Sequence, residues 1–122
     1  MGVSNRVFVS QRMRGRSEEA IDRERHLIFD ALPSLTGIRE RIEVPKLDKL
    51  TTASNSPASC VGLSIQDMAN SDLVVFAPGW RDARGCVVEH AVCLLYGLSY
   101  IELLDGDRGY YISKDGRNEP DA

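Results

Sequence analysis

With 122 residues, of which 43% are hydrophobic and 27% charged, the chain has the composition of one ordinary globular domain. A net charge of −3 at pH 7 argues against a general nucleic-acid-binding protein, and no apolar run approaches the ~20 residues that cross a bilayer. No secretory signal precedes the cysteines, so we expect a reduced chain in the cytoplasm with Cys86 and Cys93 as core residues. No cysteine pair has metal spacing, and we expect neither a zinc site nor a cofactor.

Apolar runs alternate with helical patterns along the chain, which favours an α/β fold with a mostly parallel sheet. The expected strands cover about 6–10, 38–44, 73–77 and 99–104, followed by a turn over 105–107 and a short edge strand over 110–113. The expected helices cover about 18–32, 57–69 or 60–69, and 84–96. Ser17 is the expected N-cap of the first helix and Pro33 its end, and Gly97 is expected to end the third.

These elements predict one three-layer α/β/α domain over residues 1–113. The expected order of the parallel strands is 2-1-3-4, with a fifth strand at the edge if 110–113 pairs there. Residues 114–122 are polar, and we expect a disordered tail. The segment 45–59 is rich in Ser, Thr and Asn, and it is either a lid over the site or plain surface.

Two arginine-bearing loops each follow a predicted strand. Residues 10–16 (SQRMRGR) form the first arginine loop, and residues 78–85 (PGWRDARG) form the second. Ligands of an open parallel sheet bind outside the carboxyl ends of its strands, where the strand order reverses, so we expect the five arginines to converge on one crevice. Arginine suits bidentate recognition of phosphate. The sequence therefore predicts a site for an anionic, aromatic small molecule, with a nucleotide or nucleoside as the first candidate.

The candidate ligand-binding residues are Ser10, Gln11, Arg12, Met13, Arg14 and Gly15 in the first arginine loop, and Gly79, Trp80, Arg81, Arg84 and Gly85 in the second. Structural alternatives exist for several of them. The arginines of the first loop either bind phosphate, or they are solvated or pair with the acidic residues at 18, 19 and 22. Trp80 either stacks a base or caps the core.

Glu89 is the candidate catalytic residue. It lies one turn inside the helix that follows the second arginine loop, so its carboxylate is able to point back toward the crevice. There it would attack an anomeric carbon, or stabilise the charge that develops as a glycosidic bond breaks. The alternative is an ordinary surface glutamate paired with Arg81 or Arg84.

An ordered set of motifs resembles one protein family. The segments are Phe8-Val9-Ser10-Gln11, Met13-Arg14-Gly15, Ser71-Asp72, Pro78-Gly79-Trp80 and Gly85-Cys86-Val87-Val88-Glu89-His90-Ala91. Together they look like the small bacterial and phage branch of the nucleoside 2-deoxyribosyltransferase-like superfamily, much of it known only as a domain of unknown function. The resemblance covers about residues 7–103. It implies a flavodoxin-like (Rossmann-like) fold and cleavage of the N-glycosidic bond of a deoxynucleoside or its 5'-monophosphate.

The resemblance also implies roles for single residues. Glu89 matches the nucleophile, and Arg14 and Gly15 are similar to the loop that holds the 5'-phosphate. This chain departs from the active members at two positions: Ser64 stands where they carry an aspartate, and Phe8 where they often carry a tyrosine. Asp67, one turn after Ser64, is a candidate replacement for the missing acid.

Three hypotheses about function remain open. The first is an N-glycosidase or deoxyribosyltransferase in which Glu89 is the nucleophile and Arg14 and Arg84 bind phosphate. The second, which the two departures favour, is an inactive module that senses or sequesters a nucleotide signal. The third is a subunit or adaptor with a vestigial site. Related enzymes build their sites across subunits, so we expect a homo-oligomer, in which Val92 and Leu95 would serve the contact or simply the core.

Overall fold

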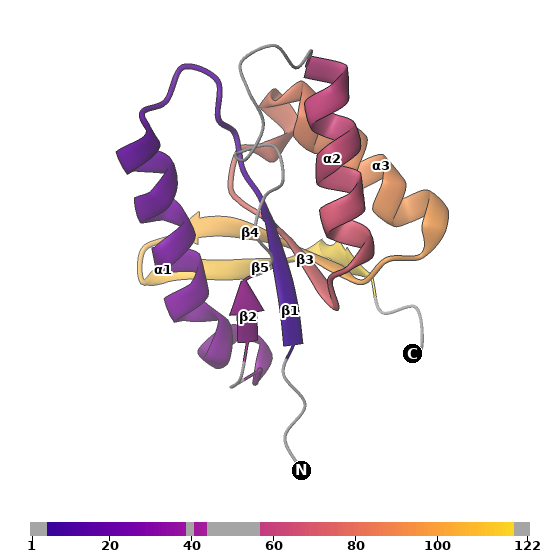
Figure 1. The fold of residues 1–122 in the computed structure, drawn as a ribbon. Coiled ribbons are helices and arrows are strands. Elements are labelled where there is room, and N and C mark those ends of the chain that lie inside the picture. The colour runs from indigo at the N-terminus through magenta and orange to yellow at the C-terminus, as the bar shows by residue number, and fades with distance from the viewer. Residues whose placement is uncertain (1–4, 39–40, 44–56, 119–122) are drawn as a thin grey trace.

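The computed structural model of the protein describes residues 5–38, 41–43 and 57–118, which form a sheet with helices on both faces (Figure 1). The strands are β1 (Asn5–Ser10), β2 (Arg41–Glu43), β3 (Leu73–Phe76), β4 (Tyr100–Gly106) and β5 (Gly109–Asn118). The helices are α1 (Glu18–Thr36), α2 (Pro57–Ala69) and α3 (Arg84–Tyr96). The sheet has the order β2-β1-β3-β4-β5, and β5 runs antiparallel to β4 while the other neighbours are parallel. The expected α/β class with a mostly parallel sheet is confirmed.

Alternate residues of the central strands point to opposite faces of the sheet, and each face has its own core. Helices α2 and α3 cover one face, where the buried residues are Phe8, Met68, Val74, Phe76, Trp80, Cys86, Cys93 and Tyr100. Helix α1 covers the other face, where they are Val7, Val9, Ile28, Leu32, Val75, Ala77, Ile101 and Leu103. The two cysteines of α3 are therefore core residues, as expected. Because β1 and β3 are neighbours, the two arginine loops leave the same end of the sheet.

Helix α1 begins as predicted but ends later. Ser17 Oγ accepts a hydrogen bond of 3.1 Å from the Ala20 amide, which makes Ser17 the N-cap. Pro33 lies inside the helix, so the prediction that it ends α1 is wrong. The last turn of α1 continues past Pro33, where Leu35 packs against the core under the helix. Gly37, with φ +79°, ends the helix, and its amide donates to the Pro33 carbonyl.

The boundaries of α3 agree with the prediction, whereas β2 begins later than predicted. Helix α3 and its glycine cap, Gly97 with φ +69°, are as predicted. Strand β2 lies at the edge, as expected, but Ile38 is not part of it, because its amide donates to the Thr36 hydroxyl at the end of α1. Residues 39, 40 and 44–56 lie outside the described residues, and with them most of the segment predicted as a lid or surface loop.

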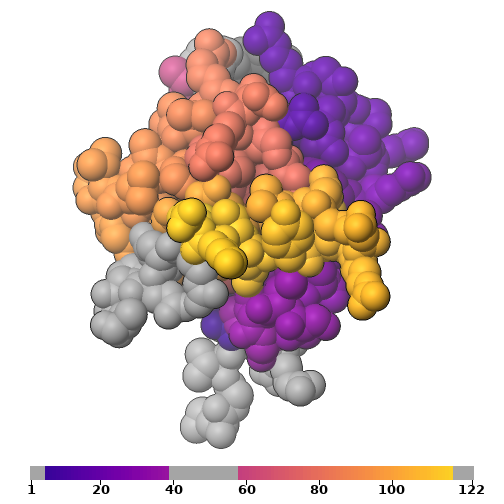
Figure 2. Space-filling view, turned by 180° about the vertical axis from the view of Figure 1, so that it is seen from behind, coloured from indigo at the N-terminus to yellow at the C-terminus, as the bar shows by residue number. Residues whose placement is uncertain are grey.

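The carboxyl-terminal hairpin is longer than the sequence predicts. Strand β4 reaches Gly106, so the turn lies at residues 107–108 and not at 105–107. Strand β5 extends to Asn118, so the tail expected from residue 114 is a strand over residues 114–118. An edge strand that faces water on one side tolerates polar residues, which explains why the pattern resembles a tail. Figure 2 shows this hairpin as a band across the side of the molecule, between α3 and α1. Within the described ranges, no helix has the length and apolar character required to span a membrane.

Candidate functional site

Glu89 and Ser10 meet at the carboxyl end of β1. Glu89 lies on the inward side of α3, which also carries Cys86 and Cys93. Its side chain is enclosed, with the residue only 6% exposed, and the buried Ser10 Oγ donates a hydrogen bond of 2.5 Å to Glu89 Oε1. A hydroxyl so close to a carboxylate makes a short, charge-assisted bond. The alternative of an ordinary surface glutamate is therefore wrong.

Trp80, in the second arginine loop, packs against other side chains of the protein. Its ring stacks on His90, with ring centroids 4.1 Å apart and planes 15° apart, and the residue is 8% exposed. The guanidinium of Arg81 lies 5.0 Å from the centre of the Trp80 ring. Of the two expectations for Trp80, the core role is the one observed. His90 and Arg81 both lie against the indole ring.

The Glu102 carboxylate contacts the polar atoms of Trp80, Arg81 and His90. The residue is 6% exposed, and one carboxylate oxygen, Oε1, accepts a hydrogen bond of 3.2 Å from Trp80 Nε1 and lies 3.6 Å from Arg81 Nη2. The other oxygen, Oε2, lies 2.9 Å from His90 Nε2. The motifs alone give no role to His90 or Glu102. The available signal is a carboxylate between the apolar residues Ile101 and Leu103, because a buried charge requires partners.

Gln11 ties the first arginine loop to α1. Its amide nitrogen donates to the Ile21 carbonyl at 3.0 Å and to Glu24 Oε1 at 2.9 Å. Its amide oxygen accepts a bond of 3.2 Å from Arg25 Nε. Both ends of the buried amide are thus used inside the protein. The side chain of Gln11, expected to bind the ligand, is directed toward α1.

Arg16 and Arg12 give the first arginine loop its shape. Arg16 Nη1 donates to the Arg12 carbonyl and to Glu24 Oε1, each at 2.8 Å, so Arg16 closes the loop onto α1. The Arg12 side chain lies over Gly79 of the second loop, where an added Cβ would be 2.9 Å from Arg12 Nε. Gly79 also has φ +82°, which favours glycine. This contact brings the two arginine loops together.

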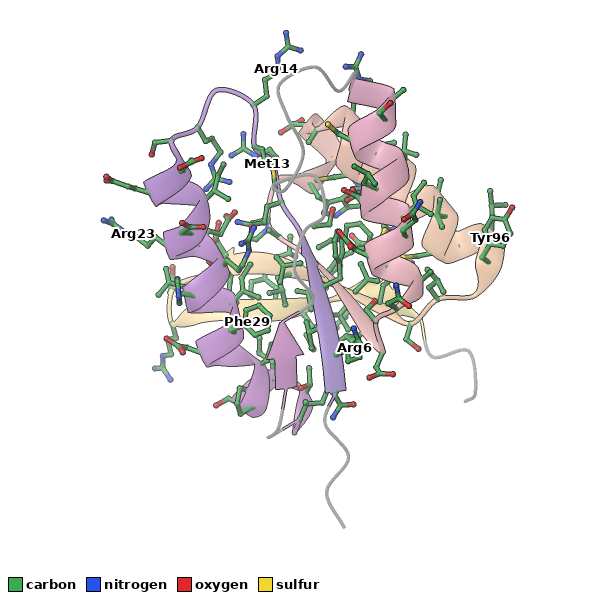
Figure 3. The ribbon with its side chains drawn as sticks, in the orientation of Figure 1. Arg6, Met13, Arg14, Arg23, Phe29 and Tyr96 are labelled. Carbon is green, nitrogen blue, oxygen red and sulfur yellow. The ribbon has the colours of Figure 1, made fainter. Side chains whose placement is uncertain are left out.

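Other predicted residues lie at the rim of the sheet's end. Met13 is half-buried, while Arg14, Gly15 and Arg84 are exposed, and Figure 3 shows Arg14 extended away from the body of the protein. Gly85 faces α2, because a Cβ there would touch Val61 at 3.6 Å. Of the five arginines expected to converge on one crevice, Arg16 lies 2.8 Å from Glu24 and Arg81 lies 3.6 Å from Glu102.

Ser64 and Asp67 both lie on the buried side of α2. They are 5% and 3% exposed, and Met68 beside them belongs to the core shared with α3. The position where the resemblance expects an aspartate is therefore an interior one. A carboxylate one turn later, at Asp67, is equally enclosed.

The Glu89 carboxylate affects the pKa of Cys93, one turn later in α3. Burial, and secondarily the Glu89 carboxylate, raise the pKa of the Cys93 thiol to about 12. A thiol with this pKa stays protonated at neutral pH and is a poor nucleophile. Cys93 is thus a packing residue beside the site.

Comparison with protein-family models, with curated proteins and with solved structures finds no match to the chain. Among the described residues, no group of three or more His, Cys, Asp or Glu is arranged to hold a metal ion. The inference of a function therefore rests on the residues of the site and on the motif resemblance.

Proposed function

We propose that the protein binds a nucleotide at the carboxyl ends of β1 and β3 and cleaves the N-glycosidic bond of a (deoxy)nucleoside 5'-monophosphate through Glu89. The observation that carries this proposal is the enclosed Glu89 carboxylate held by Ser10, at the point where the first arginine loop begins. Open parallel sheets bind their ligands at this end. The proposal includes the three-layer, flavodoxin-like arrangement of the resembled superfamily.

The Glu89 carboxylate would be the nucleophile. We expect one of its oxygens to attack the anomeric carbon as the bond to the base breaks, while the hydrogen bond from Ser10 to Oε1 holds the group in place. Water would then cleave the glycosyl ester and restore the carboxylate, as in retaining glycosidases. The hydrogen bond from Ser10 orients the carboxylate for this attack.

The anionic group of the substrate would bind to arginines. Within the described ranges, no carboxylate pairs with the guanidinium groups of Arg12, Arg14 or Arg84. A guanidinium that no carboxylate of the described residues engages is suited to bidentate contact with a phosphate. The position of Arg12 over Gly79 favours it as a contact shared by both loops.

The oligomer is a further part of the proposal. Leu95 of α3 is 79% exposed, whereas Val92 is half-buried against the core. We therefore expect Leu95, and not Val92, to contribute to a contact between subunits.

A second candidate function is an inactive module that senses or sequesters a nucleotide. Ser64 is buried where the resembled enzymes carry an acid, and Asp67 is only 3% exposed. A glycosidase without an acid at that position would lack a group to protonate the leaving base. This candidate predicts that the nucleotide is bound and recovered intact.

Product analysis separates the two candidates. The protein is incubated with ribo- and deoxynucleosides and with their 5'-monophosphates, and free base is measured by liquid chromatography. Glu89→Gln keeps an oxygen that accepts from Ser10 but loses the nucleophile. Glu19→Gln, at an exposed position of α1, is the matched control.

We expect free base from the wild type and from Glu19→Gln, and none from Glu89→Gln, with monophosphates preferred over nucleosides. Intact nucleotide recovered from all three proteins would support the binding module. If no nucleotide is either bound or cleaved, both candidates are wrong and a vestigial site is the better account.

A further inference from the structure

We infer that His90 is a positioning residue: its bond to Glu102 fixes the rotation of α3 and so places the Glu89 carboxylate against Ser10. The inference rests on the proposed function, since it concerns the position of the proposed nucleophile. It assigns His90 no contact with the substrate.

Three residues of neighbouring strands form a row under α3. Ser10 of β1 is in register with Phe76 of β3, which is in register with Glu102 of β4. All three side chains belong to the face that α3 covers, because Phe8, Val74 and Tyr100, two residues earlier in each strand, pack there. The row therefore runs across the sheet directly below the helix.

Two consecutive residues of α3 bind the two ends of this row. Glu89 reaches Ser10 on β1, and His90 reaches Glu102 on β4. Consecutive helix residues diverge by about 100° around the helix axis, which lets them reach opposite sides of Phe76. A rotation of α3 in either direction would lengthen one of the two bonds. The pair of bonds thus sets the angle at which the helix presents Glu89.

His90 is held firmly enough to serve as this anchor. Besides stacking on Trp80, its ring makes edge contacts with Phe76 at 5.0 Å and Tyr100 at 4.8 Å. A carboxylate only accepts hydrogen bonds, so the 2.9 Å contact with Glu102 requires the proton on His90 Nε2. The side chain is 13% exposed and is enclosed on several sides.

Glu102 is itself fixed in place. Trp80 Nε1 and Arg81 engage one of its oxygens, as described above. Between the pairs Ile101–Arg117 and Leu103–Ile112 the register of the hairpin shifts, so Glu102 faces an irregular stretch of β5. There Gly116 lies so close that an added Cβ would be 2.6 Å from Glu102 Cβ. The carboxylate that receives His90 therefore has little freedom to follow a displaced helix.

The test removes the donor of His90 while keeping a side chain of similar size. His90→Phe retains a ring to stack on Trp80 but has no N–H. His90→Gln and His90→Met form a second pair, alike in length, of which only the glutamine is able to donate to Glu102. His26→Phe, at an exposed position of α1, is the matched control. The readouts are the carboxyl ¹³C resonance of Glu89, assigned through its loss in Glu89→Gln, and kcat and KM for base release.

We expect His90→Phe and His90→Met to shift the Glu89 resonance and to lower kcat by roughly 10-fold or more, with KM within about twofold, because small displacements of a reacting group are costly. In His90→Gln the Glu89 resonance and kcat should stay close to those of the wild type, and in His26→Phe the resonance, kcat and KM should be unchanged. If His90→Phe fails to fold, the glutamine and methionine pair decides. A Glu89 resonance unchanged in the variants without a donor overturns the inference, even if their stability falls. A wild type that releases no base overturns the proposed function alone, since the resonance still reports the position of Glu89.

Discussion

Ser10 and Glu89 are 79 positions apart in the sequence, yet the serine hydroxyl donates a hydrogen bond of 2.5 Å to the glutamate carboxylate in the interior. Ser10→Ala would remove a donor from a buried charge, so we expect the free energy of unfolding to fall by about 1–3 kcal/mol. Urea denaturation with an unchanged m-value would measure this loss. A Ser10→Ala protein as stable as the wild type would show that the bond contributes nothing.

The three free cysteines should differ sharply in reactivity. The pKa of the Cys93 thiol is raised to about 12, so almost none of it is thiolate at pH 8. Cys60 is only half-buried. We expect iodoacetamide to alkylate Cys60 first in the folded protein, and Cys93 only after unfolding, with mass spectrometry of peptides as the readout. Equal labelling of both in the folded state would contradict the packing described for α3.

Alkaline pH should destabilise the protein. The folded pKa of Cys93, about 12, lies above its ordinary value of 9.0, so the folded state holds this proton more tightly than the unfolded state. The contribution is complete below pH 9 and is lost as the pH rises toward 12. Burial raises the pKa values of Tyr100 and Tyr110 as well, which acts in the same direction.

Cys93→Ala isolates the share of the thiol in this pH dependence. Between pH 8 and 11, the free energy of unfolding should fall less steeply in Cys93→Ala than in the wild type. The slopes are compared and not the absolute values, because the substitution also removes packing. Parallel slopes would mean that the thiol titrates alike in both states.

Gly79→Ala should disturb the contact between the two arginine loops. The new Cβ would meet Arg12 Nε at 2.9 Å, at a backbone φ of +82°. Gly37→Ala has nearly the same φ, +79°, but no atom within 4 Å, so it isolates the backbone strain of roughly 1–2 kcal/mol. We expect both variants to lose stability in thermal denaturation, but only Gly79→Ala to bind a nucleoside 5'-monophosphate more weakly in calorimetry. Equal affinities would mean that nucleotide binding does not depend on this contact.

Local signals in the sequence were sufficient for much of the fold. Ser17 as an N-cap and Gly97 as a C-cap are defined by contacts within a few residues, and both were predictable. The end of α1 was not, because Pro33 is a strong local signal whereas the packing of Leu35 against the sheet is a tertiary one. The length of β5 was not predictable for a similar reason, because its polar residues form a strand only through pairing with β4.

The candidate site was predictable in its position but not in its contacts. The order of strands and loops places Ser10 and Glu89 at one end of the sheet, and the motifs point to both. Nothing near Trp80 in the sequence reveals that its ring stacks on His90 or that Glu102, 22 positions later, accepts from its indole. Such partners depend on the register between strands, which is set by the whole sheet.

The enclosed position of Trp80 determines what optical experiments on this protein will report. It is the only tryptophan of the chain, so the emission excited near 295 nm comes from one ring in contact with His90, Arg81 and Glu102. A change of that emission upon addition of a nucleotide would signal a rearrangement of the groups that surround the indole. The same ring offers a built-in probe of unfolding, because its surroundings are lost when α3 leaves the sheet.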